Sequence, residues 1–287
     1  MPQHSVDILT GSSETTVDWR RTNMNSELVT SSLTSTLGPG YSVIRKHWKF
    51  NAKTGDGSVP LNHILRFQTF GEICPLETIL RQDSQVRLVV TRNDDNTIKR
   101  GHLVLTGELY RKDDDTILVG RSEFWLALTR PFGPPGDRTP KEVPDGLKVM
   151  KEYQLAKDDL GSRDIEDYRC KANGGKIIHK TQPVVFHMDQ SDQYRHINTN
   201  KYIDKGLDLL SHLCHEADGN VGQLRFHDIT IYFRKPFVPS DIADVDSDFV
   251  LHKDSFPGAV RLYHANDGTR SERISVAMET RGPLIDE

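Results

Sequence analysis

One stretch of the C-terminal half carries the clearest structural pattern: Asn198-Thr-Asn-Lys-Tyr-Ile-Asp-Lys-Gly-Leu-Asp-Leu-Leu-Ser-His-Leu-Cys214. Its apolar residues recur at spacings of three and four, which predicts an amphipathic helix over residues 198–214. The stripe comprises Tyr202, Ile203, Leu207, Leu210, Leu213 and Cys214. Gly206 lies on the same stripe, where it would let a neighbouring element come close. We therefore expect this helix to form the core of its half.

The segments around this helix predict a sheet. A strand is expected over residues 177–188, followed by a polar turn over 189–195, and further strands over 224–233, 242–251, 259–264 and 271–280. The N-terminal half predicts a similar order, with a strand over 41–50, a helix from Pro60 to about Pro75, and strands over 85–92, 101–111 and 116–129. Both halves end with an Arg-Ser-Glu entry into their last strand, which supports an internal duplication.

Two other regions lack such patterns. Residues 1 to about 36 are crowded with Ser and Thr and show no apolar period, which predicts a mobile arm. The Pro- and Gly-rich run that starts at Pro131 opens a charged stretch that continues to about Gly175 and is typical of a linker.

Composition excludes several classes of protein. With 37 Lys and Arg against 41 Asp and Glu, the formal net charge is −4, which argues against a nucleic-acid partner bound through bulk positive charge. No window reaches the roughly 18 apolar residues of a membrane-spanning helix, so we expect no membrane partner. The three cysteines are far apart, which supports neither a disulfide framework nor a zinc site, and we expect a cytoplasmic protein.

The dense polar segment that precedes the helix is the candidate for chemistry. It reads His187-Met-Asp-Gln-Ser-Asp-Gln-Tyr-Arg-His-Ile-Asn-Thr-Asn-Lys-Tyr202, whereas the nucleophile elbow, the P-loop and the dinucleotide-binding motif are absent from the sequence. The first N–H groups of a helix carry the positive end of its dipole and can polarise a carbonyl. Asp192 would then supply a base or a nucleophile.

The segment from Asp192 to Tyr202 resembles the active-site turn of the hotdog-fold thioesterases. It is most similar to the acyl-ACP thioesterases of plants and bacteria, whose pattern is Asp-x-Asn-x-His-Val-Asn-Asn-x-Lys-Tyr-Ile. The matching residues are Asp192, His196, Ile197, Asn198, Lys201, Tyr202 and Ile203. The run Arg138-Thr-Pro-Lys-Glu-Val-Pro144 also resembles the family's segment after its first hotdog. The resemblance extends over about residues 40–285.

The resemblance implies an α+β fold, the double hotdog, in which two long central helices are each wrapped by a curved antiparallel sheet. The corresponding division is an N-terminal arm over residues 1–38, an N-terminal hotdog over 39–132, a linker over 133–175, and a C-terminal hotdog over 176–287 that carries the active-site turn. Exposed edges of such sheets are compatible with a homodimer.

The resemblance also implies a reaction. Asp192 would be the nucleophile or general base against a fatty acyl or polyketide thioester of CoA or an acyl carrier protein, with His196 assisting. N–H groups near Asn198 and Thr199 would stabilise the oxyanion. No cofactor and no metal is expected. The predicted substrate-binding residues are Tyr194 and Thr199, together with Gln68 and Glu72, which lie on the stripe of Leu61 and Leu65 in the helix predicted from Pro60.

Two departures from the family pattern keep other functions open. Tyr194 stands where the family has an Asn, and Pro236 and Phe237 stand where an acidic residue is expected on the strand after the helix. The alternatives are a dehydratase, isomerase or cyclase acting on a polyketide-type intermediate, and a non-catalytic acyl-binding protein.

Each site residue also has a structural interpretation. Asp192 and Asn198 suit a turn and a helix N-cap, and Tyr202 suits a core. Gln68 and Glu72 would equally suit a solvated helix edge. His187 and Asp189 share a strand face, but no spacing between them and Asp192 is diagnostic of a metal site.

Overall fold

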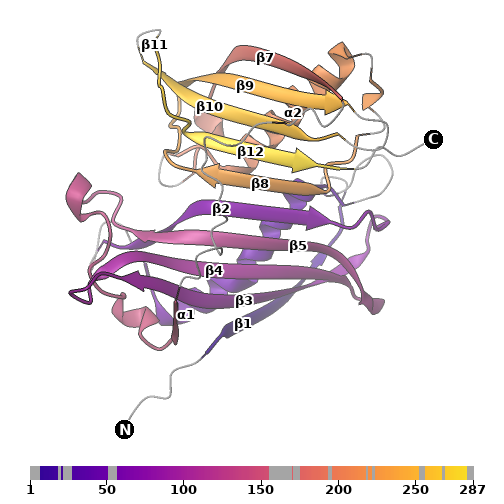
Figure 1. The fold of residues 1–287 in the computed structure, drawn as a ribbon. Coiled ribbons are helices and arrows are strands. Elements are labelled where there is room, and N and C mark those ends of the chain that lie inside the picture. Colours follow the sequence, from indigo (N-terminus) through magenta and orange to yellow (C-terminus); the bar gives the residue numbers. More distant parts are fainter. Residues whose placement is uncertain are drawn as a thin grey trace. The chain divides into compact units, whose positions relative to one another are not determined.

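The computed structural model describes residues 7–18, 21, 28–50, 57–154, 170, 175–192, 196–217, 219–221, 224–251, 256–266 and 269–282. The chain divides into two compact units, residues 1–65 with 69–161 and residues 66–68 with 162–287. In each unit, one α-helix packs against strands that pair mainly antiparallel (Figure 1). Neither helix in the described ranges combines the length and apolarity needed to cross a bilayer.

The N-terminal unit is a sheet with the strand order β1-β3-β4-β5-β2 and a parallel contact between β3 and β6. Its strands are β1 (Leu9–Thr16), β2 (Val59–Thr69), β3 (Ile79–Arg92), β4 (Ile98–Arg111), β5 (Asp114–Thr129) and β6 (Glu152–Gln154). A 3-10 turn, η1 (Thr30–Thr36), leads into helix α1 (Leu37–His47), which packs on β1, β3 and β4. Short 3-10 turns η2 (Pro135–Asp137) and η3 (Asp145–Leu147) follow β5.

The first two elements predicted for this half are wrong, because helix and strand are exchanged. The predicted strand over 41–50 lies mostly in α1, where Gly40 and Ile44 are buried four residues apart, and the C-cap residue Trp48 continues this spacing. The predicted helix from Pro60 is strand β2, in which the neighbours Ile64 and Leu65 are both buried. Because both faces of β2 are covered at that point, its apolar residues do not alternate, and their spacing resembles that of a helix.

The prediction of a mobile arm is also wrong for part of residues 1–38. Strand β1 pairs with β3 along its whole length, from Leu9 opposite Val86 to Thr16 opposite Ile79. Main-chain pairing requires no apolar period, and Leu9 and Leu33 anchor the two ends of this region in the core. Because this segment is rich in Ser and Thr, its composition gave no sign of the edge strand β1.

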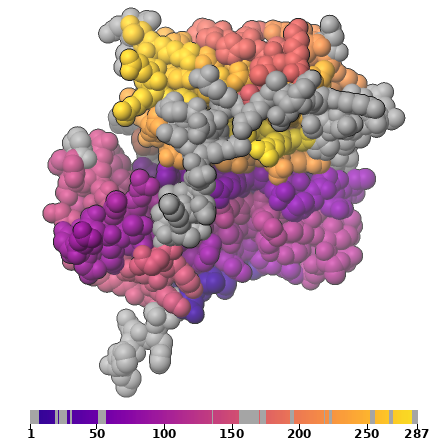
Figure 2. All heavy atoms as spheres, in the orientation of Figure 1, coloured from indigo at the N-terminus to yellow at the C-terminus, as the bar shows by residue number. Residues whose placement is uncertain are grey.

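The C-terminal unit follows the predicted order of elements. Its sheet order is β8-β12-β10-β9-β7, with β11 paired to β10. The elements are β7 (Lys176–Val185), η5 (Met188–Gln190), α2 (Thr199–Glu216), β8 (Asp228–Phe233), β9 (Ile242–Leu251), β10 (Gly258–Asn266), β11 (Thr269–Arg270) and β12 (Val276–Arg281). Helix α2 packs on β7, β9 and β10. Among the described strands, β7 pairs with β9 alone, and Figure 2 shows this red segment at the surface.

The helices differ in length. Helix α2 has 18 residues and α1 has 11, so the expectation of two long central helices is not confirmed. The predicted stripe of α2 is buried at Tyr202, Ile203, Leu210, Leu213 and Cys214, while Leu207 is half-buried.

Gly206 is buried where α2 crosses the sheet, as its place on the stripe predicts. A Cβ atom added there would lie 2.3 Å from Cε of Met278, whose side chain is buried. Gly206→Ala is therefore expected to lower the free energy of unfolding by about 1 kcal/mol, since overpacking outweighs the gain in helix propensity. Urea denaturation of the full chain measures this change. Gly38→Ala is the control, because no atom outside its own stretch of helix lies within 4 Å of its added Cβ. A more stable Gly206→Ala protein would contradict the close contact.

Two neutral histidines lie together in the N-terminal unit. Nδ1 of His63 on β2 is 3.1 Å from Nε2 of His102 on β4, and the rings stack with centroids 5.3 Å apart. Burial and the charge of Arg100 lower the pKa of His63 to about 4. Burial, with smaller effects from His63 and Arg100, lowers the pKa of His102 to about 3. Both rings are therefore uncharged near neutral pH.

Acid is expected to destabilise the chain through this pair. An unfolded histidine takes up a proton near pH 6.5, whereas folded His63 does so only near pH 4 and folded His102 near pH 3, so stability falls as the pH falls below about 6.5. By pH 4, His63 alone accounts for about 3 kcal/mol. Urea denaturation between pH 7 and pH 4 measures the slope. The double variant His63→Phe with His102→Phe should reduce it, and an unchanged slope would contradict the assignment.

Candidate functional site

The turn between β7 and α2 is fixed by main-chain bonds around Asp192. Ser191 forms an antiparallel bridge with Ile197. The Asp192 N–H donates to the carbonyl of His196 at 2.7 Å, and the His196 N–H donates to Oδ1 of Asp192 at 3.1 Å. Asp192 and His196 are both half-buried. The carboxylate thus belongs to a closed loop that leads directly into the helix.

Asn198 is the N-cap of α2, as its side chain predicts. Its Oδ1 accepts from the Asn200 N–H at 3.0 Å. Its own N–H donates to the carbonyl of Gln190 at 2.7 Å, so an oxyanion would compete with that carbonyl for this donor. Thr199, the first residue of α2, is half-buried. The positive end of the helix dipole therefore lies at the end of the turn that carries Asp192.

A segment between β8 and β9 packs behind this turn. The Ile197 N–H donates to the carbonyl of Phe237 at 2.9 Å, and the Phe237 N–H donates to the hydroxyl of Tyr202 at 2.9 Å. The Tyr202 ring is buried against Phe186 and Phe233, with centroids 5.4 Å away in each case. Tyr202 is thus a core residue whose hydroxyl ties α2 to the Phe237 segment.

The same segment brings in a second carboxylate, which the sequence did not single out. Oδ2 of Asp241 accepts from the Val238 N–H at 2.9 Å and lies 3.5 Å from Nε2 of His264. Nδ1 of His264 lies 2.7 Å from Oγ of Ser275. The imidazole also stacks on the Phe237 ring, with centroids 4.0 Å apart. Asp241, His264 and Ser275 therefore form a continuous polar chain beside the Phe237 segment.

Electrostatics links the two carboxylates. Burial raises the pKa of the Tyr202 hydroxyl most, and the charges of Asp241 and Asp192 raise it further. Both carboxylates therefore act on one hydroxyl at the N-terminal end of α2. Burial lowers the pKa of His264, as does the charge of Lys235, so the imidazole is neutral near pH 7 and can donate a proton through only one nitrogen.

Phe237 is itself not acidic, and an acidic residue, Asp241, follows it four positions later. Asp241 immediately precedes β9, and Ser240 before it has a left-handed backbone with φ of 74°. Such a conformation turns the chain sharply, which places Asp241 back beside His264. The sequence signal is the Pro239-Ser240-Asp241 turn, whose residue types favour tight turns.

The other predicted site residues are distributed as follows. Gln68 lies on β2 and Glu72 in the segment after it, both with exposed side chains, so they do not share a helical stripe. Tyr194 lies outside the described residues. The side chains of His187 and Asp189 are exposed, and the part of the chain that the structure describes holds no group of three or more His, Cys, Asp or Glu side chains suited to a metal ion.

Comparison with known proteins identifies the fold. No protein-family model matches the sequence, and no curated protein matches it. Solved structures do match. A protein assigned as an oleoyl thioesterase from Lactobacillus plantarum superposes with a TM-score of 0.67 at 8% identity, covering 97% of this chain and 98% of that one. An acyl-ACP thioesterase from Bacteroides thetaiotaomicron VPI-5482 has a TM-score of 0.60 at 13% identity, covering 94% and 96%.

The chain has the double hotdog fold. The double hotdog also serves other chemistry, since a MaoC-like dehydratase matches with a TM-score of 0.50 at 10% identity, covering 89% of this chain and 84% of that one. At such low identities the likeness concerns the fold, and the reaction has to be argued from the site itself.

Proposed function

We propose that this double hotdog is an acyl thioesterase that hydrolyses a fatty acyl or polyketide thioester of an acyl carrier protein or CoA. The observation that carries the proposal is the half-buried carboxylate of Asp192, which the main chain holds in the turn that leads into α2. The similarity of this turn to that of the acyl-ACP thioesterases supports it. A cytoplasmic location belongs to the same proposal.

The reaction needs a nucleophile, a proton acceptor and a stabiliser of the oxyanion. Asp192 would take a proton from the water that attacks the thioester carbonyl, with His196 beside it in the loop. The positive end of the α2 dipole would stabilise the tetrahedral oxyanion, as would main-chain N–H groups at Thr199. Collapse of that intermediate breaks the C–S bond, and the thiolate that leaves takes up the proton held by Asp192, which restores the carboxylate. The products are a carboxylic acid and a free thiol.

Asp241 and His264 would act as positioning residues for this chemistry. They hold the Phe237 segment, which in turn bonds Ile197 of the turn and Tyr202 of α2. Replacing either group should shift the pH profile of turnover more than the affinity for substrate, since neither is placed against the reacting atoms.

A second function has one observation in its favour. Dehydration, isomerisation or cyclisation needs an acid and a base, and the carboxylate–imidazole pair of Asp241 and His264 supplies such groups near Asp192. The substitutions at Tyr194, Pro236 and Phe237 relative to the thioesterase pattern agree with this alternative. The third hypothesis is that the chain is a non-catalytic acyl-binding protein.

Thiol release distinguishes the three. The full chain is incubated with acyl-CoA and acyl-carrier thioesters of increasing chain length, and free thiol is measured with a thiol-reactive dye. Hydrolysis predicts thiol together with the free acid. A lyase, isomerase or cyclase predicts a product of altered unsaturation or ring closure, seen by mass spectrometry, without thiol. A folded protein that binds acyl thioesters and turns over none of them would leave only the binding function.

A further inference from the structure

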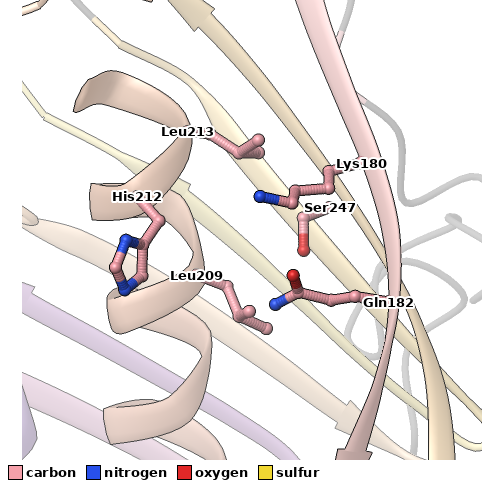
Figure 3. Close-up of a pocket in the computed structure, with 6 residues that line it drawn as sticks. All are labelled: Lys180, Gln182, Leu209, His212, Leu213 and Ser247. Atoms are coloured by element: carbon pink, nitrogen blue, oxygen red, sulfur yellow. The ribbon is translucent and has the colours of Figure 1, made fainter. Parts of the chain in front are cut away.

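A second candidate site lies within the C-terminal unit, between the later turns of α2 and the edge of the sheet. A cavity of about 190 Å³ is lined by Lys180, Gln182, Leu209, His212, Leu213 and Ser247. Figure 3 shows the strand residues pointing toward Leu209 and Leu213 on the helix. Leu209 follows Asn198 by eleven residues, which is roughly 16 Å along a helix axis. The cavity is therefore separate from the Asp192 turn.

The decisive feature of this cavity is a buried hydroxyl that lacks a partner. Ser247 on β9 is 2% exposed, and among the described residues its Oγ has no hydrogen-bond partner. Ser247 is paired in register with Lys180 on β7, so their side chains leave the same face of the sheet. A buried hydroxyl normally finds a partner, and here the cavity is the space from which one can come.

The polar groups that β7 and β9 contribute to the lining share one property: each can donate a hydrogen bond. Ser247 offers a hydroxyl, Gln182 an amide NH₂, and Lys180 an ammonium group with three donors. One of these three donors already forms a hydrogen bond to Oε1 of Glu216. The opposite wall, formed by Leu209 and Leu213, is apolar and buried. The cavity therefore combines several donors with an aliphatic surface.

We propose that this cavity binds a short-chain carboxylate. Its oxygens would accept hydrogen bonds from Ser247, Gln182 and Lys180, and its alkyl chain would lie against Leu209 and Leu213. Inorganic phosphate fits less well, because Lys180 already faces Glu216 and phosphate carries more charge with no apolar part. The proposal does not depend on the hydrolysis proposed above, since it concerns a different part of α2.

Titration of the full chain with hexanoate, followed by isothermal calorimetry or by amide chemical shifts, tests this site. Saturable binding in the millimolar range is expected for a ligand of this size, with at least a tenfold loss for 1-hexanol and no binding of inorganic phosphate. Ser247→Ala and Gln182→Ala should each weaken hexanoate binding several-fold. Gln182 is only half-buried, so its variant keeps the test valid if the Ser247 variant is unstable.

Asp192→Asn separates this site from the proposed active site. The variant should bind hexanoate as the wild type does, and loss of binding in it would place the carboxylate at the turn and overturn the proposal. Absence of saturable hexanoate binding in the wild type would also overturn the proposal. Unchanged affinity in both Ser247→Ala and Gln182→Ala would likewise overturn the assignment.

Discussion

Asp192→Asn is expected to reduce the rate of thiol release by about 10²- to 10⁴-fold, the usual contribution of a positioned acid–base group. The loop should survive the change, because an Asn side chain keeps an oxygen that can accept from the His196 N–H. The amide can neither take up a proton from water nor attack the thioester. The measurement is kcat/KM on the best substrate of the thioester panel, with the melting temperature as a check on folding.

The matched control is Asp189→Asn. Asp189 lies three residues earlier in the same turn, in η5, and its side chain is exposed. Activity near that of the wild type is expected there, which separates the role of Asp192 from a general loss of negative charge. Full activity in Asp192→Asn would remove the basis of the proposed function. If Asp241→Asn were inactive in that case, the base would have to be sought at Asp241.

The C-terminal half could be predicted because its local and tertiary signals agree. Helix α2 buries one continuous stripe, and Asn198 caps it with its own side chain. A one-sided helix produces a regular spacing in the sequence, and a cap residue marks where that spacing begins. The strands predicted over 224–233, 242–251 and 259–264 are observed as β8, β9 and β10, with ends at most four residues away.

The first helix and the second strand of the N-terminal half carry misleading sequence patterns for a physical reason. In β2, Ile64 and Leu65 are both buried, and in α1 the buried position 40 is a glycine that contributes no apolar signal. A strand covered on both faces loses its alternation, and a helix that packs through glycine loses part of its stripe. Whether such a segment forms a helix or a strand depends on the pairing of the whole sheet. The periodicity of a single sequence carries no information on that pairing.

The candidate site could be predicted only in its local part. Asp192, His196 and Asn198 are neighbours in the chain, so one turn suffices to bring them together. Asp241 and His264 reach the same place through the pairing of β9 with β10, in which His264 lies opposite Ala243. The spacing of residues in the sequence does not reveal such a register. The position of Asp241 could therefore be found only from the structure.

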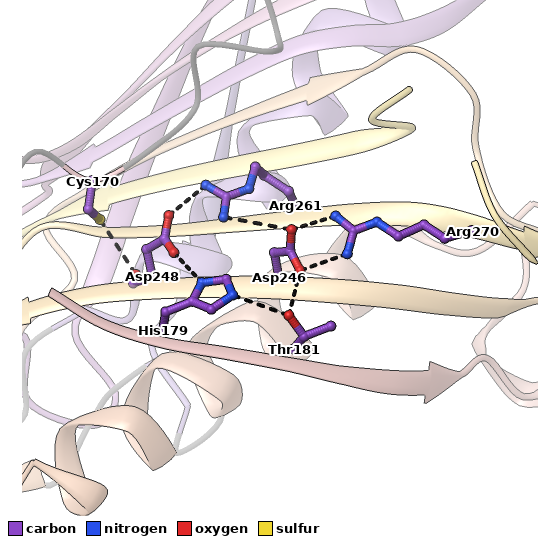
Figure 4. Close-up of polar contacts among 7 residues, drawn as sticks. All are labelled: Cys170, His179, Thr181, Asp246, Asp248, Arg261 and Arg270. Atoms are coloured by element: carbon purple, nitrogen blue, oxygen red, sulfur yellow. Dashed lines mark hydrogen bonds and ion pairs between the residues drawn. The ribbon is translucent and has the colours of Figure 1, made fainter. Parts of the chain in front are cut away.

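A network of polar and charged side chains, buried at Asp248 and Arg261, links strands of the C-terminal unit on the face opposite α2. Figure 4 shows its members, which are Cys170, His179, Thr181, Asp246, Asp248, Arg261 and Arg270. At its centre, Nη1 of Arg261 donates to Oδ2 of Asp248 at 2.6 Å, and Nδ1 of His179 lies 2.7 Å from the other carboxylate oxygen. Burial alone would raise the pKa of Asp248, but the bonds from Arg261 and His179 outweigh it and lower the pKa.

Arg261→Leu is therefore expected to lower the free energy of unfolding by about 3–5 kcal/mol, since it leaves the buried Asp248 carboxylate without its main partner. Arg261 is 2% exposed and Asp248 7% exposed, so water replaces the lost bond poorly. Urea denaturation measures the change against Arg121→Leu. Arg121 pairs with Glu108 at the surface, where an ion pair contributes about 0–1 kcal/mol.

Adding Asp248→Leu to Arg261→Leu should recover much of the lost stability, because the double variant no longer holds an unpaired buried charge. Equal effects of Arg261→Leu and Arg121→Leu would show that the buried network contributes no more than a surface pair.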